Sequence, residues 1–173
     1  MEYKIAHYKI NTGNTCRYVL GSFGENPLFV IGLNPSTADD KKPDRTTRRV
    51  MGFAEGNGFD SFVMLNLYPQ RATKPTDLDK EIDNAKIEAN IEEILNAING
   101  IPNPTILAAW SATISIRGYF KECIQRLFDA TKENKINWIK LGEPTKEGHP
   151  RHPLYALKEI ELTKFDVQAY INN

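Results

Sequence analysis

The sequence predicts an α/β fold, a three-layer α/β/α sandwich on a central, mostly parallel sheet of about four strands. Two observations indicate this class. Short apolar runs rich in β-branched residues alternate along the chain with amphipathic stretches of helical period. Strands that alternate with helices form parallel sheets covered on both faces, because their crossovers are right-handed. The length of 173 residues, 40% of them apolar, favours one domain over residues 1–173.

Each apolar run is too short for a helix and is typical of a buried strand. The four runs are Leu28–Leu33, Ser61–Leu67, Thr105–Trp110 and Asn137–Leu141. Before them, Tyr3–Ile10 and Arg17–Leu20 show the alternation of a β-hairpin, which would lie on one edge of the sheet.

Helical periodicity fills the stretches between and after these strands. The predicted helices are Thr46–Gly56, Asp77–Asn99, about Ile116 to Ala130, and a short one near Lys164–Tyr170. The first has the clearest signals at its ends, because Asp44 is a suitable N-cap and Asn57-Gly58 a suitable stop.

Charge and composition limit the function classes. The chain has 22 basic and 22 acidic residues, so it lacks the global positive field of a protein that coats nucleic acid, although a local basic patch remains open. We expect no membrane association, because there is no long apolar run and no signal peptide. The two widely spaced cysteines suggest reduced thiols and a cytoplasmic location.

Ligands of parallel sheets bind beyond the carboxyl ends of the strands, which directs attention to four loops. In the first, Asn34 follows a strand, and its amide could hold a water or a base edge. Ser36, Thr37 and Asp39 add polar groups. The alternative, equally open, is a turn whose side chains satisfy their own backbone.

A cationic stretch follows, from Lys41 to Arg49. Arg48 and Arg49 lie near the start of the predicted helix, where free N–H groups also favour anions, so they could bind phosphate. The alternative is a solvated helix start that is partly neutralised by Asp39, Asp40 and Asp44.

The second loop contributes three candidates. Asn66 ends its strand, Tyr68 could stack on a base, and Arg71 could hold a phosphate or carboxylate. Alternatively, Tyr68 packs against the end of the sheet and Arg71 pairs with an aspartate.

The last proline-rich loop, 142–153, holds His149, Arg151 and His152. A histidine there could act as acid or base, or donate a hydrogen bond to a developing anion. It could also bind metal with Asp39, Asp40 or Asp44, or simply pack in a structured connection. The sequence contains no phosphate-binding glycine loop, dinucleotide fingerprint, serine elbow or catalytic Cys–His pairing, and we expect no cofactor.

Taken together, these motifs resemble a bacterial and phage family known as domain of unknown function 1643. The matching stretches are Arg17-Tyr18, Leu33–Asp39, Arg48-Arg49, Gly52–Ala54, Asn66-Leu67, Arg71–Thr73, Ala109-Trp110 and Pro150–Tyr155. One departure is Ser111, where the family pattern has glycine. The family name implies no activity.

A more distant resemblance is to the uracil-DNA glycosylase superfamily, also an α/β/α sandwich. Gly32-Leu33-Asn34-Pro35-Ser36 is similar to its first motif, although Ser36 stands where that motif has glycine; His149–Pro153 is similar to its second. The resemblance implies that Asn34 positions the attacking water, that His149 or His152 stabilises the departing anion, and that the base is flipped out. Tyr68 or Phe53 could then supply a stacking face.

Three functional hypotheses result, and the sequence does not decide whether the chain is an enzyme. The first is a nucleic-acid- or nucleotide-binding protein that can cleave an N-glycosidic bond. Its catalytic residues would be Asn34, His149 and His152, and its substrate-binding residues Ser36, Thr37, Asp39, Arg48, Arg49, Asn66, Tyr68, Arg71 and Arg151. The second is a binding module without chemistry. The third is a metal-assisted phosphoester hydrolase using Asp39, Asp40, Asp44 and the histidines.

Overall fold

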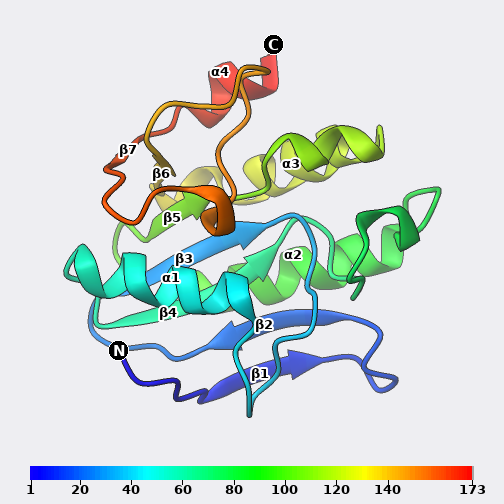
Figure 1. The fold of residues 1–173 in the computed structure, drawn as a ribbon. Coiled ribbons are helices and arrows are strands. Elements are labelled where there is room, and N and C mark those ends of the chain that lie inside the picture. Colours follow the sequence, from blue (N-terminus) through cyan, green and yellow to red (C-terminus); the bar gives the residue numbers. More distant parts are fainter. Residues whose placement is uncertain (173) are drawn as a thin grey trace.

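One seven-stranded mixed sheet forms the centre of the computed structural model, which describes residues 1–172 (Figure 1). Its strands are β1 (His7–Ile10), β2 (Arg17–Gly21), β3 (Pro27–Gly32), β4 (Ser61–Asn66), β5 (Thr105–Ala108), β6 (Asn137–Leu141) and β7 (Leu162–Lys164). The helices are α1 (Arg45–Gly56), α2 (Asn84–Ile98), α3 (Phe120–Ala130) and α4 (Val167–Asn172). No helix within residues 1–172 has both the length and the apolar content needed to cross a bilayer.

The strand order is β1-β2-β4-β3-β5-β6-β7. The neighbours β4, β3, β5 and β6 run parallel, and these are the four strands that the sequence predicts. The sheet is nevertheless larger than expected. The N-terminal hairpin β1–β2 joins through an antiparallel pairing with β4, and β7 adds an antiparallel edge at β6. The three-residue strand β7 was missed, because so short a segment has no recognisable period.

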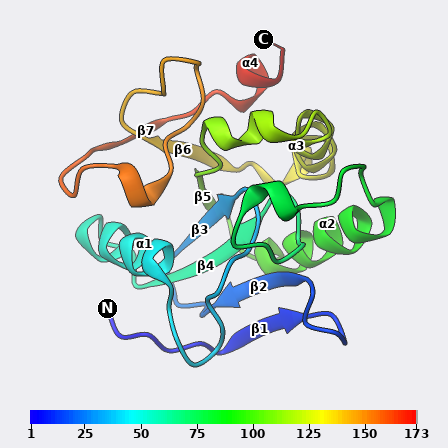
Figure 2. The same ribbon diagram turned by 45° about the vertical axis from the view of Figure 1, so that its right-hand side comes forward.

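Helices cover both faces of the sheet (Figure 2). The two-residue period of β3 explains how one strand serves two cores. Leu28 and Val30 pack on the α1 side, whereas Phe29 and Ile31 pack on the side of α2 and α3. All four side chains are fully buried, so β3 is covered from both sides.

The first helix has the ends predicted from its local signals. Asp44 caps α1, and its carboxylate accepts hydrogen bonds from the backbone N–H of Thr47 at 2.8 Å and from the Thr47 hydroxyl at 2.9 Å. Asn57 ends the helix, as expected. The start of α1 is therefore fixed by a residue beside the carboxyl end of β3.

The prediction that α2 begins at Asp77 was wrong, because the helix begins at Asn84. A distant side chain changes the local preference: Arg117 donates to the backbone carbonyls of Thr76, Leu78 and Asp79. These bonds hold the three carbonyls turned toward Arg117 and stabilise the non-helical backbone. The segment stays irregular until Asp83, whose carboxylate caps α2 by accepting from the N–H of Lys86 at 3.2 Å.

The other two helices also begin later than predicted. A 3₁₀ helix, Ala112–Ile116, precedes α3, and the turn of residues 117–119 separates the two, so α3 begins at Phe120 instead of Ile116. The last helix begins at Val167 instead of Lys164, because Leu162–Lys164 forms β7.

Replacing Asp83 with alanine should lower the free energy of unfolding by about 1 kcal/mol, because the N-cap of α2 is lost. Urea unfolding followed by circular dichroism measures this change. Asp83→Asn is the matched control and should retain most of the stability, since asparagine is also a good N-cap. Equal stability of the alanine and asparagine variants would contradict the capping role.

Candidate functional site

A cleft of about 370 Å³ opens at the carboxyl ends of the parallel strands. It lies beside the neighbouring strands β3 and β5, and the loops that follow them lead to α1 on one face of the sheet and to α3 on the other. This is the topological switch point at which open α/β sheets bind ligands. The volume lies in the range of small-molecule sites.

Segments that are far apart in the sequence line this cleft. They are Arg17 from β2, the end of β3 and the loop after it (Gly32, Leu33, Asn34, Ser36 and Thr37), residues 44–47 at the start of α1, Met64 and Asn66 from β4, then Ala72, Thr73 and Pro75, Trp110 and Thr113 after β5, and His152, Leu154 and Tyr155. Of the predicted site residues, the structure brings together Asn34, Ser36, Thr37, Asn66 and His152.

Arg17 is the most unusual residue in the lining. It is only 2% exposed, and its Nη1 donates to the carbonyl of Ala38 at 3.0 Å. Its Nε is buried and has no hydrogen-bond partner. Within residues 1–172, no carboxylate lies within ion-pair distance of this guanidinium. The cleft therefore contains a buried, unpaired positive charge.

A second arginine lies close to the first. Arg71 donates from Nη1 to the same Ala38 carbonyl at 3.2 Å and to the carbonyl of Ser36 at 2.7 Å. Burial, and then the nearby charge of Arg71, lower the pKa of Arg17 to about 10. Arg17 stays protonated at neutral pH, so an anion would be attracted here.

The start of α1 adds to this positive potential. Arg45, Thr46 and Thr47 line the cleft. The first N–H groups of a helix have no acceptor within the helix and favour anions. Asp44 is the one acidic residue in the lining, and its carboxylate is engaged by Thr47.

Asn66 lines the cleft and has a buried, unpaired donor. It is 1% exposed, and its Nδ2 has no hydrogen-bond partner. The parallel register places it beside Gly32, where an added Cβ would lie 3.2 Å from Asn66 Oδ1. Asn90 of α2 fixes the strand end by donating to the Asn66 carbonyl at 2.8 Å. Asn66 is thus held in place while its donor stays free.

In Asn34, unlike Asn66, the amide nitrogen has hydrogen-bond partners and the amide oxygen has none among the described residues. Its Nδ2 donates to the carbonyls of Pro35 at 3.0 Å and Ala72 at 2.9 Å. Because both bonds use the amide nitrogen, Oδ1 is the acceptor that remains for a ligand or a water. The turn interpretation of Asn34 is therefore correct for its nitrogen and leaves its oxygen for function.

The environment of His152 defines its proton position. The backbone N–H of Leu154 donates to His152 Nδ1 at 3.2 Å, so the proton of the neutral ring is on Nε2. Burial lowers the pKa of His152. Near neutral pH the ring is therefore an uncharged donor at the edge of the cleft.

Three arginines predicted to bind substrate hold loops instead. Arg49 donates to the carbonyls of Pro153 and Ala156, and Arg71 to those of Ser36 and Ala38. Arg151 donates from Nε to the carbonyl of Glu143 at 2.8 Å. None of the three lines the cleft.

Three further predicted residues lie outside the cleft. Tyr68 is fully buried, and its hydroxyl donates to Asp79 at 2.6 Å, so its ring is not available for stacking. Asp39 accepts from the N–H groups of Lys41 and Lys42, which lowers the pKa of its carboxyl group. Arg48 is exposed on α1.

His149 lines a different cavity, of about 650 Å³, between α3 and α4. The hydroxyl of Tyr170 accepts from Trp110 Nε1 at 3.2 Å and lies 2.7 Å from His149 Nδ1. The structure separates the two candidate histidines and brings only His152 to the cleft with Asn34.

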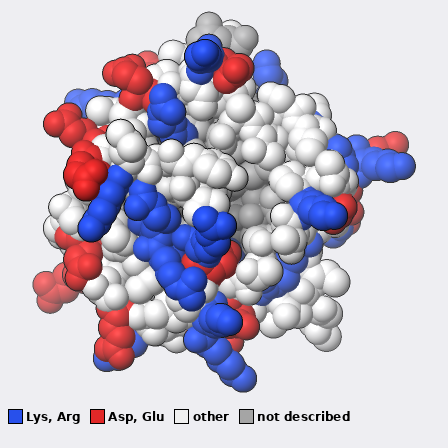
Figure 3. Space-filling view, viewed as in Figure 1, with Lys and Arg blue, Asp and Glu red and all other residues white. Residues whose placement is uncertain are grey.

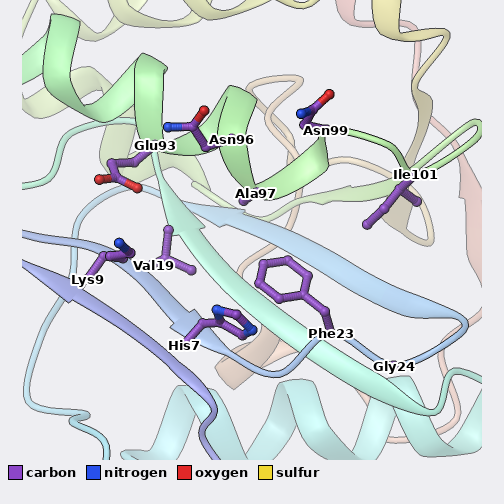
Figure 4. A pocket seen from close by; sticks show the side chains of 10 residues that line it. All are labelled: His7, Lys9, Val19, Phe23, Gly24, Glu93, Asn96, Ala97, Asn99 and Ile101. Carbon is purple, nitrogen blue, oxygen red and sulfur yellow. The ribbon is translucent and has the colours of Figure 1, made fainter.

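A third hollow, of about 390 Å³, lies between the β1–β2 hairpin and α2 (Figure 4). Phe23 and Val19 form its apolar floor, while Lys9 and Glu93 stand at its sides. None of the predicted site residues lines it. Among the described residues, no group of three or more His, Cys, Asp or Glu side chains is placed to hold a metal ion.

Sequence reasoning missed Arg17 as a site residue, although a signal was present. The two-residue period of β2 puts Arg17 on the same face as Val19, which is 3% exposed in the core. A charged residue on the core face of a strand needs either a partner or a function.

Comparison with known proteins supports one family. The family model described as "Protein of unknown function (DUF1643)" matches residues 17–154. This range includes the cleft residues from Arg17 to Leu154. No curated protein and no solved structure matches the chain significantly.

The lowered pKa of His152 predicts a pH-dependent stability. The folded ring stays neutral below the ordinary pKa of about 6.5, whereas the unfolded ring takes up a proton. This stabilising effect is complete above that pH and is lost as the pH falls through the lower pKa of the folded state. We expect the free energy of unfolding, measured with urea at pH 7.5 and 5.5, to fall less on acidification in His152→Gln than in the wild type.

His7→Gln is the matched control, because His7 is exposed on β1 and outside the cleft, and this variant should lose as much unfolding free energy on acidification as the wild type. A His152→Gln variant that behaves like this control would contradict the assigned burial effect.

Proposed function

The chain belongs to the DUF1643 family, and we propose that it binds a phosphate-bearing nucleotide unit in the cleft. The buried, unpaired guanidinium of Arg17 carries this proposal. Removing a charge from water costs several kcal/mol unless a counter-charge or good hydrogen bonds compensate for it. Here the protein supplies one carbonyl, a second arginine and the more distant charge of Asp44, whose carboxylate Thr47 already engages, so we infer that the main compensating anion comes from the ligand.

Phosphate is the anion that this arrangement suits best. A guanidinium binds phosphate oxygens through several N–H groups, and the start of α1 supplies further donors in the same cleft. The hydroxyl groups of Ser36, Thr37 and Thr46 add neutral donors along the wall. A simple carboxylate would use fewer of these groups.

The amides in the cleft favour a base as the second part of the ligand. Asn66 offers a buried donor, Nδ2, and Asn34 offers the acceptor Oδ1. A nucleobase edge presents both acceptors and donors, so it can satisfy one or both amides. The unpaired donor of Asn66 should meet a carbonyl oxygen, because leaving it unsatisfied costs about 1–3 kcal/mol.

A second candidate function, hydrolysis of the N-glycosidic bond, is favoured by the tautomer of His152. The bond between sugar and base breaks with its electron pair on the base, and water adds to the sugar carbon. The resulting products are the free base and a sugar hydroxyl. Asn34 Oδ1 would accept a hydrogen bond from the water, and His152 Nε2–H would donate to the base anion. The resemblance to the uracil-DNA glycosylase superfamily supports the same two roles.

Replacing Arg17 with methionine tests the binding function. The variant should lose the rise in Tm that saturating thymidine 5′-monophosphate gives to the wild type, because the anion no longer has its partner. Its unfolding free energy without ligand should stay the same or rise, since an unpaired buried charge has been removed. A purely structural arginine would give the opposite pattern, with lost stability and unchanged ligand response.

Replacing Asn34 with alanine tests the chemistry. If the chain is a glycosylase, release of base from a single-stranded oligonucleotide carrying uracil should fall by about 100-fold or more. Oligonucleotide affinity should change little. Asn96 is exposed on α2 and does not line the cleft, so Asn96→Ala is the control and should leave base release unchanged. Base release that survives in Asn34→Ala would rule out this role of Asn34. If the wild type binds the oligonucleotide but releases no base, the glycosylase function is wrong and only the binding function stands.

A further inference from the structure

An exposed aromatic ring stands at the mouth of the cleft. Among residues 1–172, Tyr155 is the most exposed large apolar side chain, at 81%, and it also lines the cleft. Its ring centroid lies 5.7 Å from that of His152. An exposed ring of this size at the edge of a binding site marks a contact surface.

The backbone around Tyr155 is held firmly, so the exposure belongs to the folded structure. Arg49 of α1 donates to the carbonyls of Pro153 and Ala156, on either side of this ring. The N–H of Tyr155 donates to the His152 carbonyl at 3.1 Å, and Ala156 is buried. A ring that is fixed before binding loses little entropy when a ligand stacks on it.

Positive charge surrounds this ring on the same side of the molecule. Arg45 and Arg48 are exposed on α1, and neither forms an ion pair within the described residues. Arg49 adds a third cation, stacked 4.9 Å above the ring of Phe53. Figure 3 shows Lys and Arg side chains gathered over α1 and the loop before it. The chain as a whole has no net charge, so the gathering of cations on this face differs from the overall charge balance.

We propose that Tyr155 is a stacking platform for a nucleobase adjacent to the one in the cleft, so that the ligand is single-stranded nucleic acid. This inference rests on the proposed nucleotide-binding function. An aromatic face accepts any base, but only when the base is unpaired and its own face is free. Arg45 and Arg48 would contact the phosphates that connect the two units. The sequence-based candidates for stacking, Tyr68 and Phe53, are buried.

The test compares two probes, fluorescently labelled short oligothymidylate by anisotropy and thymidine 5′-monophosphate by calorimetry. Wild-type protein should bind the oligonucleotide more tightly than the monophosphate. In Tyr155→Ala the affinity for the oligonucleotide relative to that for the monophosphate should fall about 5- to 100-fold, the usual effect of losing one stacked base. Tyr155→Phe keeps the ring and should keep the ratio.

Two controls are available in the chain. Leu157 is 76% exposed but does not line the cleft, so Leu157→Ala should leave the ratio unchanged. Arg48→Ala should lower the slope of log affinity against log salt by about 0.7, the value for one phosphate contact on a single strand. Lys9→Ala removes an exposed cation from the hollow of Figure 4 and should not alter that slope.

The outcomes separate the two proposals. If the monophosphate binds but the oligonucleotide binds no more tightly, or if Tyr155→Ala keeps the wild-type ratio, stacking on Tyr155 is wrong and the cleft function stands. A duplex that binds as tightly as the single strand would also overturn the stacking proposal. If neither probe binds even at low salt, the nucleotide-binding function itself is overturned.

Discussion

The buried charge of Arg17 is the constraint around which the cleft is built. A guanidinium shielded from water needs compensation, and the described chain provides one hydrogen bond, to the carbonyl of Ala38, and the charge of Asp44 beyond ion-pair distance. That carbonyl also accepts from Arg71, so one peptide group lies between two cations. The loop after β3 therefore has a fixed shape, and the positive charge remains directed at the cleft. Asn34 and Asn66 each keep one amide group free beside this anchored loop.

Two arginines that could have been ligands have a different task, which is to fix the walls of the cleft. Arg71 holds the loop after β3, and Arg49 holds the 3₁₀ helix Pro153–Tyr155 against α1. Guanidinium groups suit this work because they donate several hydrogen bonds in fixed directions. Backbone carbonyls have no sequence signature, so a sequence cannot show which arginines bind them. The same residue type thus has an unpaired buried charge at position 17 and holds backbone carbonyls at positions 49 and 71.

The parts of the fold that depend on local signals were predictable, and those set by distant contacts were not. Apolar runs gave the four parallel strands, and Asp44 gave the start of α1. The start of α2 was mispredicted because Arg117 captures three carbonyls from another part of the chain. Sheet topology brought Asn34 and His152 together as expected, since both follow strands of one sheet. Arg17 was missed because it comes from the antiparallel hairpin, outside the parallel unit to which the loop rule applies.

The contact between Arg49 and Ala156 joins residues 107 positions apart. One wall of the cleft is therefore made early in the chain and the other near its end. During synthesis the α1 wall leaves the ribosome long before the segment Pro153–Tyr155, so the cleft is complete only when both segments have been made. Truncation after β6 should consequently remove His152, Leu154 and Tyr155 from the lining and leave Arg49 without its two carbonyl acceptors.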